Sequence, residues 1–145
     1  MSFVPENVRV GDVLPDLVLP PLNRATLALF AGASGDHHPM HIDIDYARAS
    51  GMPDVFAQGM LVMAWLGRLV TSWAPQERLR TFGGRFVGIT HLGNIVTCSG
   101  RVAEIVERNG ERVARLDLLA SNQFGQQKIA AEAIVSLARD EGAHR

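Results

Sequence analysis

The chain has 145 residues, of which 47% are hydrophobic and 20% charged, and its formal net charge is −1. This composition is typical of a globular domain, and it gives no reason to expect a nucleic acid or an anionic membrane as a partner. The single cysteine excludes an internal disulfide and fits a reducing compartment, so we expect a cytoplasmic protein with one domain over residues 1–145.

The first half of the sequence predicts one strand followed by short helices. Residues 12–20 are strand-like, with prolines that suit a sheet edge or a strand end. Residues 24–31 have apolar side chains at helical spacing, which predicts a short helix. A second short helix is expected over residues 44–50, because Asp43 is a suitable N-cap and Gly51 a suitable C-terminal stop.

The strongest helical signal is the apolar run at residues 60–73, which Pro75 ends. The run is apolar on nearly all sides, as is typical of a buried helix. Arg68 interrupts it, so it falls short of the ~20 apolar residues of a membrane-spanning helix. The N-terminal residues lack the basic and apolar regions of a signal peptide. We therefore expect neither a membrane anchor nor a secretory signal.

The second half of the sequence is strand-rich. Glycine and asparagine pairs at positions 93–94 and 109–110 predict turns, and residues 112–120 alternate between two faces, as in a half-buried strand. One strand, a helical middle and a run of antiparallel strands predict an α+β fold, in which a curved antiparallel sheet packs on the long helix. The strand-like segments are residues 82–90, 95–106, 112–122 and 127–137.

The passage between the predicted helices concentrates polar side chains. Asp36 and His41 lie five positions apart with Pro39 between them. Because Pro39 restricts the residue before it, we expect no regular helix through His37 and His38. The passage is then a shaped loop whose side chains can converge. Asp36 alone would fit an Asx turn, and His41 alone a structural histidine, so only the combination suggests an acid–base site.

The sequence SGDHHPMHIDIDYARASG, followed by FAQGML, resembles the hydratase motif of the MaoC-like family. That family includes the (R)-specific enoyl-CoA hydratases and the related 3-hydroxyacyl-ACP dehydratase subunits of mycobacterial type. Two positions depart from the family pattern, since His38 stands where Asn is usual and Gln58 where His is frequent. The resemblance implies a hot-dog fold. The matching positions are Ser34, Gly35, Asp36, Pro39, His41, Asp43, Gly51, Gly59, Met60 and Leu61.

The resemblance implies hydration of trans-2-enoyl thioesters to (R)-3-hydroxyacyl thioesters, or the reverse dehydration. Asp36 and His41 would hold one water molecule between them, and which of the two is the base stays open. The Gly59 backbone N–H, at the start of the long helix, would be the oxyanion donor. Ser34, His38 and Gln58 would lie beside the substrate.

The acyl chain is expected along the face of the long helix that carries Ala64 and Gly67, where small side chains leave room. The alternative is that Gly67 only allows close packing of helix and sheet. The substrate would be an acyl-CoA or acyl-ACP thioester of undetermined acyl group, and no cofactor is expected. We expect a homodimer that closes the open sheet edge, or else a heteromer with a paralogous subunit.

Other functions fit the sequence less well. A hot-dog thioesterase would use a carboxylate on the long helix, and residues 60–73 contain none. A non-catalytic acyl-binding subunit would be expected to lose the Asp36 and His41 pair. Pro39 disrupts the helical spacing that a metal site using His37 and His38 would need, so we expect no metal.

Cys98 and His91 lie outside the motif and are not expected to take part in catalysis. Cys98 lies in a strand-like run without an adjacent histidine, so it is not expected to be a nucleophile. His91 is expected at the surface.

Overall fold

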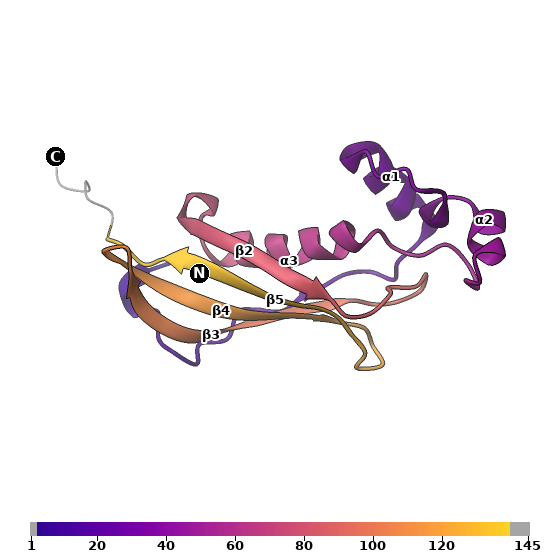
Figure 1. The fold of residues 1–145 in the computed structure, drawn as a ribbon. Coiled ribbons are helices and arrows are strands. Elements are labelled where there is room, and N and C mark those ends of the chain that lie inside the picture. The colour runs from indigo at the N-terminus through magenta and orange to yellow at the C-terminus, as the bar shows by residue number, and fades with distance from the viewer. Residues whose placement is uncertain (1–2, 140–145) are drawn as a thin grey trace.

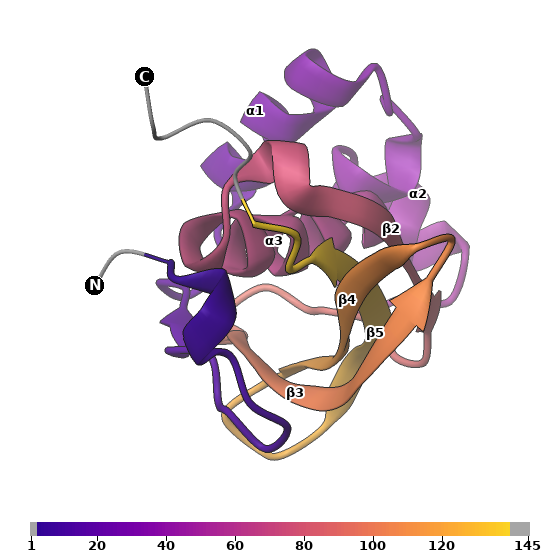
Figure 2. The same cartoon turned by 90° about the vertical axis from the view of Figure 1, so that its left-hand side faces the viewer.

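The computed structural model describes residues 3–139, and within that range five strands form one antiparallel sheet in the order β1-β3-β4-β5-β2. β1 and β2 are therefore the two edge strands. The sheet curls around one long helix, as Figures 1 and 2 show from two directions. The strands are β1 (Leu17–Val18), β2 (Leu79–Phe86), β3 (Thr97–Arg108), β4 (Glu111–Ser121) and β5 (Gln127–Ser136).

The helices follow the local signals in the sequence. α1 (Arg24–Ser34) is capped by Asn23, whose side chain accepts a hydrogen bond from Thr26 N. α2 (Ile44–Ala49) has the predicted cap, because the Asp43 carboxylate accepts hydrogen bonds from the first turn. α3 (Gly59–Trp73) is the long helix. Single 3-10 turns occur at Pro5–Asn7, Pro39–His41 and Gln76–Arg78.

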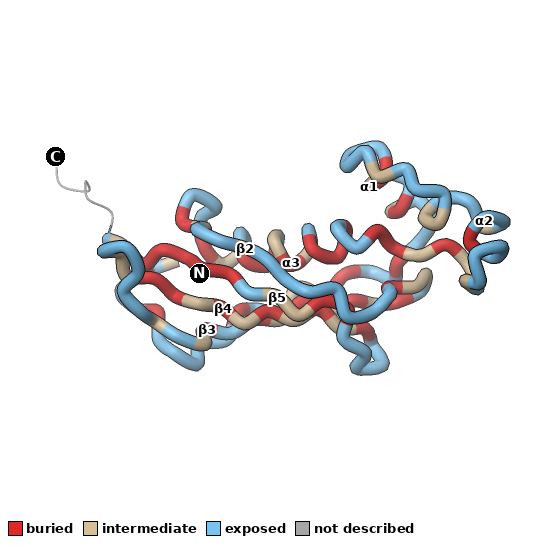
Figure 3. The backbone as a smooth tube through the Cα atoms, in the orientation of Figure 1, coloured by how far each residue is buried: buried red, intermediate tan, exposed pale blue. Residues whose placement is uncertain are grey.

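The core lies between α3 and the concave side of the sheet. Figure 3 shows buried residues recurring along α3, β4 and β5, whereas most of β2 is exposed. The prediction that α3 is buried on nearly all sides is wrong on one side, because Met60 is 57% exposed and Ala64 is exposed as well. The sheet covers only the opposite side, which carries the buried Leu61, Val62, Leu66, Leu69 and Val70.

The strand predicted at residues 82–90 is shifted in the structure. β2 ends at Phe86. Val87 N still donates to Lys128 O on β5 at 2.9 Å, and the chain then runs beside the segment that precedes α3. Ala57 N donates to Thr90 O at 2.9 Å, and Phe56 forms an isolated β-bridge with His91. His91 is therefore half-buried, and the expectation that it lies at the surface is wrong.

Candidate active site

The loop that carries the Asp36 and His41 pair projects beyond the first turn of α3, together with α1 and α2 (Figure 1). Gly35 ends α1 with a φ of 75°, a left-handed conformation that favours glycine. The chain then turns through a 3-10 turn that contains His41, so the expectation that no regular helix runs through His37 and His38 is confirmed. The N-terminus of α3 faces this loop.

Asp36 uses its two carboxylate oxygens differently. Oδ1 accepts a hydrogen bond from His38 N at 3.3 Å, which is the Asx turn that its position suggested. Oδ2 lies 3.8 Å from His41 Nε2, and the Asp36 side chain is 44% exposed. The Ser34 hydroxyl fixes the backbone here, since it donates to Phe30 O at 2.6 Å and accepts from Asp36 N at 3.1 Å. The structure thus brings the acid and the histidine together.

Contacts with Phe56 hold His41 in one orientation. Its Nδ1 lies 2.7 Å from the carbonyl oxygen of Phe56. A carbonyl can only accept, so Nδ1 carries the hydrogen, and Nε2 of the neutral ring has a free lone pair. The ring of Phe56 packs edge-on against the imidazole at 5.1 Å, and the His41 side chain is only 12% exposed. The free lone pair is therefore on the nitrogen that faces Asp36.

The first turn of α3 has no side-chain cap. The N-cap residue is Gln58, but its amide points inward and donates to Leu27 O at 3.1 Å. Gln58 is completely buried, and its Oε1 has no hydrogen-bond partner within residues 3–139. No residue of the described chain accepts a hydrogen bond from Gly59 N. The N–H of Gly59 therefore remains available to a ligand, as at many anion-binding helix ends, whereas Leu61 N in the same turn donates to Gln58 O at 3.1 Å.

A cavity of about 170 Å³ connects these features, since both His41 and Gly59 line it. Its wall is completed by Val62 on α3 and by the segment that follows β2. The volume is below the ~300 Å³ of a typical small-molecule pocket, so it suits the head of a ligand rather than a whole thioester. Lys128 also lines this cavity. Lys128 was not among the predicted site residues, although it is the only lysine in the chain and lies in an apolar strand.

The other predicted substrate residues do not line this cavity. His38 is exposed, and its ring contacts those of His41 and Tyr46 edge-on at 6.1 and 5.8 Å. Ala64 and Gly67 do not line the cavity. A Cβ placed on Gly67 would lie 3.4 Å from the ring of Phe82, which supports the alternative that this glycine allows close packing of α3 and β2. The acyl path along this face stays a prediction.

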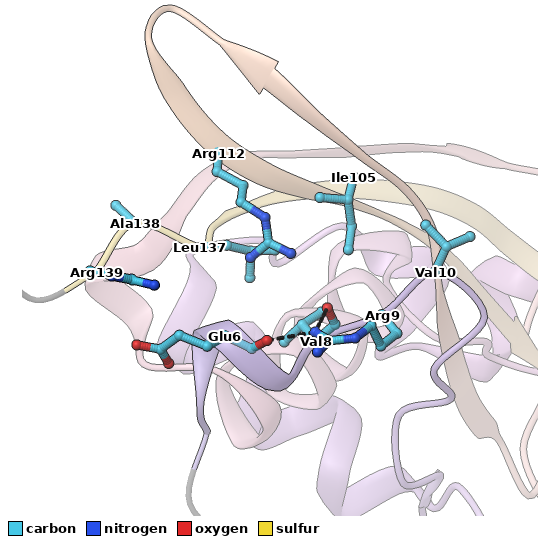
Figure 4. Close-up of a pocket in the computed structure, with 9 residues that line it drawn as sticks. All are labelled: Glu6, Val8, Arg9, Val10, Ile105, Arg112, Leu137, Ala138 and Arg139. Carbon is cyan, nitrogen blue, oxygen red and sulfur yellow. Dashed lines mark hydrogen bonds between the residues drawn. The ribbon is translucent and has the colours of Figure 1, made fainter.

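A larger cavity of about 650 Å³ lies at the opposite end of the molecule (Figure 4). Two of its three arginines already bind backbone carbonyls, because Arg9 donates to Glu6 O and Val8 O, and Arg112 donates to Pro5 O. It contains no histidine, and arginine does not deprotonate in proteins. This cavity therefore lacks an acid–base pair comparable to Asp36 and His41.

Cys98 is a buried thiol that does not take part in this site. Burial raises the pKa of the Cys98 thiol to about 12, which keeps it protonated and unreactive, as predicted. Among residues 3–139 no group of three His, Cys, Asp or Glu side chains is arranged to hold a metal ion. Within the same range, none of the helices has the length and hydropathy that crossing a membrane requires.

Comparison with known proteins identifies the family of the chain. The MaoC like domain matches residues 10–122. No curated protein matches the chain. Among solved structures, R-hydratase PhaJ1 from Pseudomonas aeruginosa is 26% identical, with a TM-score of 0.80 over 92% of this chain and 85% of that one. The ChsH1–ChsH2 complex from Mycobacterium tuberculosis is 27% identical, with a TM-score of 0.77 over 90% of this chain and 98% of that one.

A third structure, the (R)-hydratase from A. caviae involved in PHA biosynthesis, is 24% identical, with a TM-score of 0.80 over 92% of this chain and 99% of that one. These similarities confirm the predicted hot-dog fold, in which a curled antiparallel sheet packs on a helix. The chain belongs to the MaoC-like family, and it is an enzyme of the hydratase and dehydratase class.

Proposed function

We propose that this chain hydrates trans-2-enoyl thioesters to (R)-3-hydroxyacyl thioesters, or catalyses the reverse dehydration. The observation that carries the proposal is the Asp36 and His41 pair, held 3.8 Å apart with His41 in a fixed orientation beside an uncapped helix N-terminus. A distance of 3.8 Å is too long for a direct hydrogen bond. It is short enough for a single water molecule to contact both side chains.

The two groups are suited to hold that water. The ionised carboxylate of Asp36 accepts hydrogen bonds, and so does His41 Nε2, because Nδ1 carries the hydrogen. One water can donate one hydrogen to each, which directs the lone pairs of its oxygen away from both. Those lone pairs are then free to attack C3 of an enoyl group. Either side chain can take the proton as the oxygen attacks.

The bonds of the reaction balance with water as the only added reactant. The water oxygen bonds to C3 while the C2–C3 π electrons move toward the thioester, whose oxygen becomes enolate-like. One proton of the water returns to C2, delivered by the group that received it or by its neighbour, and the carbonyl reforms. The N–H of Gly59, which lines the same cavity as His41, can hold the oxygen while it is negative.

The solved relatives support hydration with (R) stereochemistry, and one of them also supports a heteromeric assembly. PhaJ1, at 26% identity, is an R-hydratase, which favours hydration with (R) stereochemistry. The ChsH1–ChsH2 structure is a complex of two different chains, which favours the heteromeric alternative. A thioesterase has no comparable support, because α3 carries no carboxylate from Gly59 to Trp73.

We propose a homodimer formed through β2. This strand is a sheet edge, and an unpaired edge invites pairing with another chain. Its end and the following segment expose apolar side chains, since Phe86, Val87 and Ile89 are 57%, 48% and 43% exposed. Sedimentation should give about twice the chain mass of 15.8 kDa. A monomer at micromolar concentration contradicts the dimer, and assembly only with a second, different chain supports the heteromer.

The activity can be tested with crotonyl-CoA by following enoyl absorbance and free CoA together. A hydratase removes the absorbance without releasing CoA, whereas a thioesterase releases CoA. Chiral analysis of the product should give the (R) isomer. Asp36→Asn should abolish most of the turnover, while Asp45→Asn, a matched change at an exposed residue of α2, should not. Activity that is independent of Asp36 overturns the proposal.

A further inference from the structure

Lys128 occupies an unusual position for a charged side chain. It is the only lysine among the 14 basic residues of the chain, and it is only 4% exposed. In the pairing of β4 with β5, Ala120 lies opposite Ile129 and Ser121 opposite Gln127, so Lys128 is the extra residue of a β-bulge. A bulge interrupts the alternation of a strand and re-aims side chains, and such bulges are frequent beside active sites. As a result, Lys128 and Ile129 are both buried although they are consecutive.

The neighbouring backbone leaves room for this side chain. Gly88, which follows β2, lies against the bulge. A Cβ on Gly88 would lie 2.6 Å from Gln127 O and 3.5 Å from Lys128 Cδ, so a larger residue would clash with the backbone there. The lysine side chain thereby fits between β5 and the segment after β2, and it lines the cavity that also contains His41 and Gly59.

The ammonium group is only partly satisfied. Lys128 Nζ donates to Ile89 O at 2.7 Å, and no carboxylate of residues 3–139 forms an ion pair with it. An ammonium has three N–H groups, so two remain without an acceptor among the described residues. Burial lowers the pKa of Lys128, because the charged form is desolvated. A buried cation without a counter-charge destabilises a fold, which makes a purely structural role a poor explanation.

We propose that Lys128 is a substrate-contacting residue, whose ammonium donates a hydrogen bond to the thioester oxygen together with the Gly59 N–H. The assignment of that oxygen rests on the proposed function. When water attacks C3, the negative charge develops on this oxygen, and a positive charge in a small, desolvated cavity stabilises it. The Lys128 ammonium has no counter-charge in the free protein, and the negative oxygen that forms during the reaction would supply one.

The alternative is that Lys128 only holds the segment after β2 through Ile89 O. That segment supports the first turn of α3, since Thr90 O accepts from Ala57 N. The two roles differ in what they predict for Lys128→Met, which keeps an unbranched side chain one heavy atom shorter and removes its charge. A structural role predicts a lower melting temperature. The proposed role predicts about 100-fold lower kcat, little change in KM, and a melting temperature that is unchanged or higher.

Two further variants complete the kinetic test. Lys128→Arg keeps the charge and should recover part of the lost kcat. Arg108→Met removes an exposed positive charge at the end of β3, far from the cavity, and should leave kcat unchanged. A Lys128→Met enzyme with normal kcat overturns the proposal, and so does one whose loss of activity parallels a loss of stability.

A direct measurement uses the fact that the chain has one lysine. Selective ¹³Cε labelling of lysine gives a single side-chain resonance, which belongs to Lys128. Butyryl-CoA, which has the thioester but no double bond to hydrate, should shift this resonance, whereas CoA alone should not. An unchanged resonance at millimolar butyryl-CoA overturns the contact. If the resonance shifts but no enoyl-CoA is hydrated, the contact stands and the proposed hydratase function fails.

Discussion

The imidazole of His41 donates its Nδ1 hydrogen to the carbonyl of Phe56 at 2.7 Å, and Phe56 lies three residues before Gly59. One short segment therefore orients the histidine and also leads into the first turn of α3. The segment is itself anchored, because Arg24 on α1 binds the carboxylate of Asp54 through two hydrogen bonds of 2.9 and 2.6 Å. The candidate base and the candidate oxyanion donor thus share one support.

If Asp36 and His41 hold the same water, their contributions to catalysis should not add. Asp36→Asn and His41→Gln should each lower kcat/KM by about 100-fold or more, the scale of general acid–base catalysis. The double variant should be little worse than either single variant. Steady-state kinetics with crotonyl-CoA measures all three, and His37→Gln, a change at the exposed neighbouring histidine, is the matched control. Losses that multiply in the double variant would show that the two residues act separately.

Local signals in the sequence predicted several elements of the structure. Asp43 caps α2, and Gly51, with a φ of 87°, follows its end. Asn109 and Gly110 form the β3–β4 turn with φ values of 51° and 75°, as a two-residue hairpin turn requires. These features depend on a few adjacent residues whose backbone preferences are strong. The order of residues around Pro39 likewise determined the loop that brings Asp36 toward His41.

Features that depend on distant pairing could not be predicted in this way. The β2 strand ends early because the chain after Phe86 pairs with the segment before α3, and that pairing also buries part of His91. The bulge at Lys128 arises from the register between β4 and β5. The side of α3 that the sheet covers also depends on contacts between distant segments. Because the helix is apolar on nearly all sides, its sequence did not show that Ala64 would be exposed.

His38 can be replaced by asparagine, the usual residue of the family, with little loss. The His38 Nδ1 accepts a hydrogen bond from Met40 N at 3.2 Å, and an asparagine oxygen can accept the same bond. His38→Asn should therefore keep kcat/KM close to that of the unaltered enzyme. His38→Leu, which cannot cap the turn, is the matched comparison and should be less stable. If His38→Asn is inactive while His41→Gln keeps normal turnover, the catalytic histidine is His38.

The stability of the sheet should depend on pH through Glu111. Hydrogen bonds from Arg80 and from the Ser136 hydroxyl lower the pKa of this carboxyl from 4.5 to about 2. A lowered pKa in the folded state stabilises the fold above the unfolded pKa, and this stabilisation is lost as the pH falls toward about 2. The side chains of Glu111 and Arg80 are partly exposed. Solvent screening therefore limits this contribution to the free energy of unfolding to about 1 kcal/mol.

Thermal melts of the unaltered chain and of Glu111→Gln should thus differ most above pH 4.5, and the curves should converge between pH 4.5 and about 2. Glu107→Gln is the control, because Glu107 is exposed on β3 and forms no ion pair within residues 3–139. A constant difference across this pH range would mean that the amide changes stability through its shape and not through its charge.

Gly59 has two separable reasons to be glycine. A Cβ at this position would lie 2.9 Å from Cε1 of the Phe86 ring, which lines the same cavity as Gly59, and it would narrow the space that we propose for the thioester oxygen. Gly59→Ala should fold, because Phe86 is 57% exposed and can move, and because alanine is compatible with the start of a helix. Its kcat should fall by about 100-fold if the N–H of Gly59 holds the oxyanion.

The double variant Gly59→Ala with Phe86→Ala distinguishes the two reasons. Removing the ring relieves the 2.9 Å contact but leaves the new methyl group on the residue whose N–H is the proposed oxyanion donor. We expect the double variant to remain as slow as Gly59→Ala, while Phe86→Ala alone keeps most of its kcat. Recovery of kcat in the double variant would mean that glycine is required only to accommodate the ring of Phe86, and the oxyanion donor would then have to be sought among the other groups of this cavity.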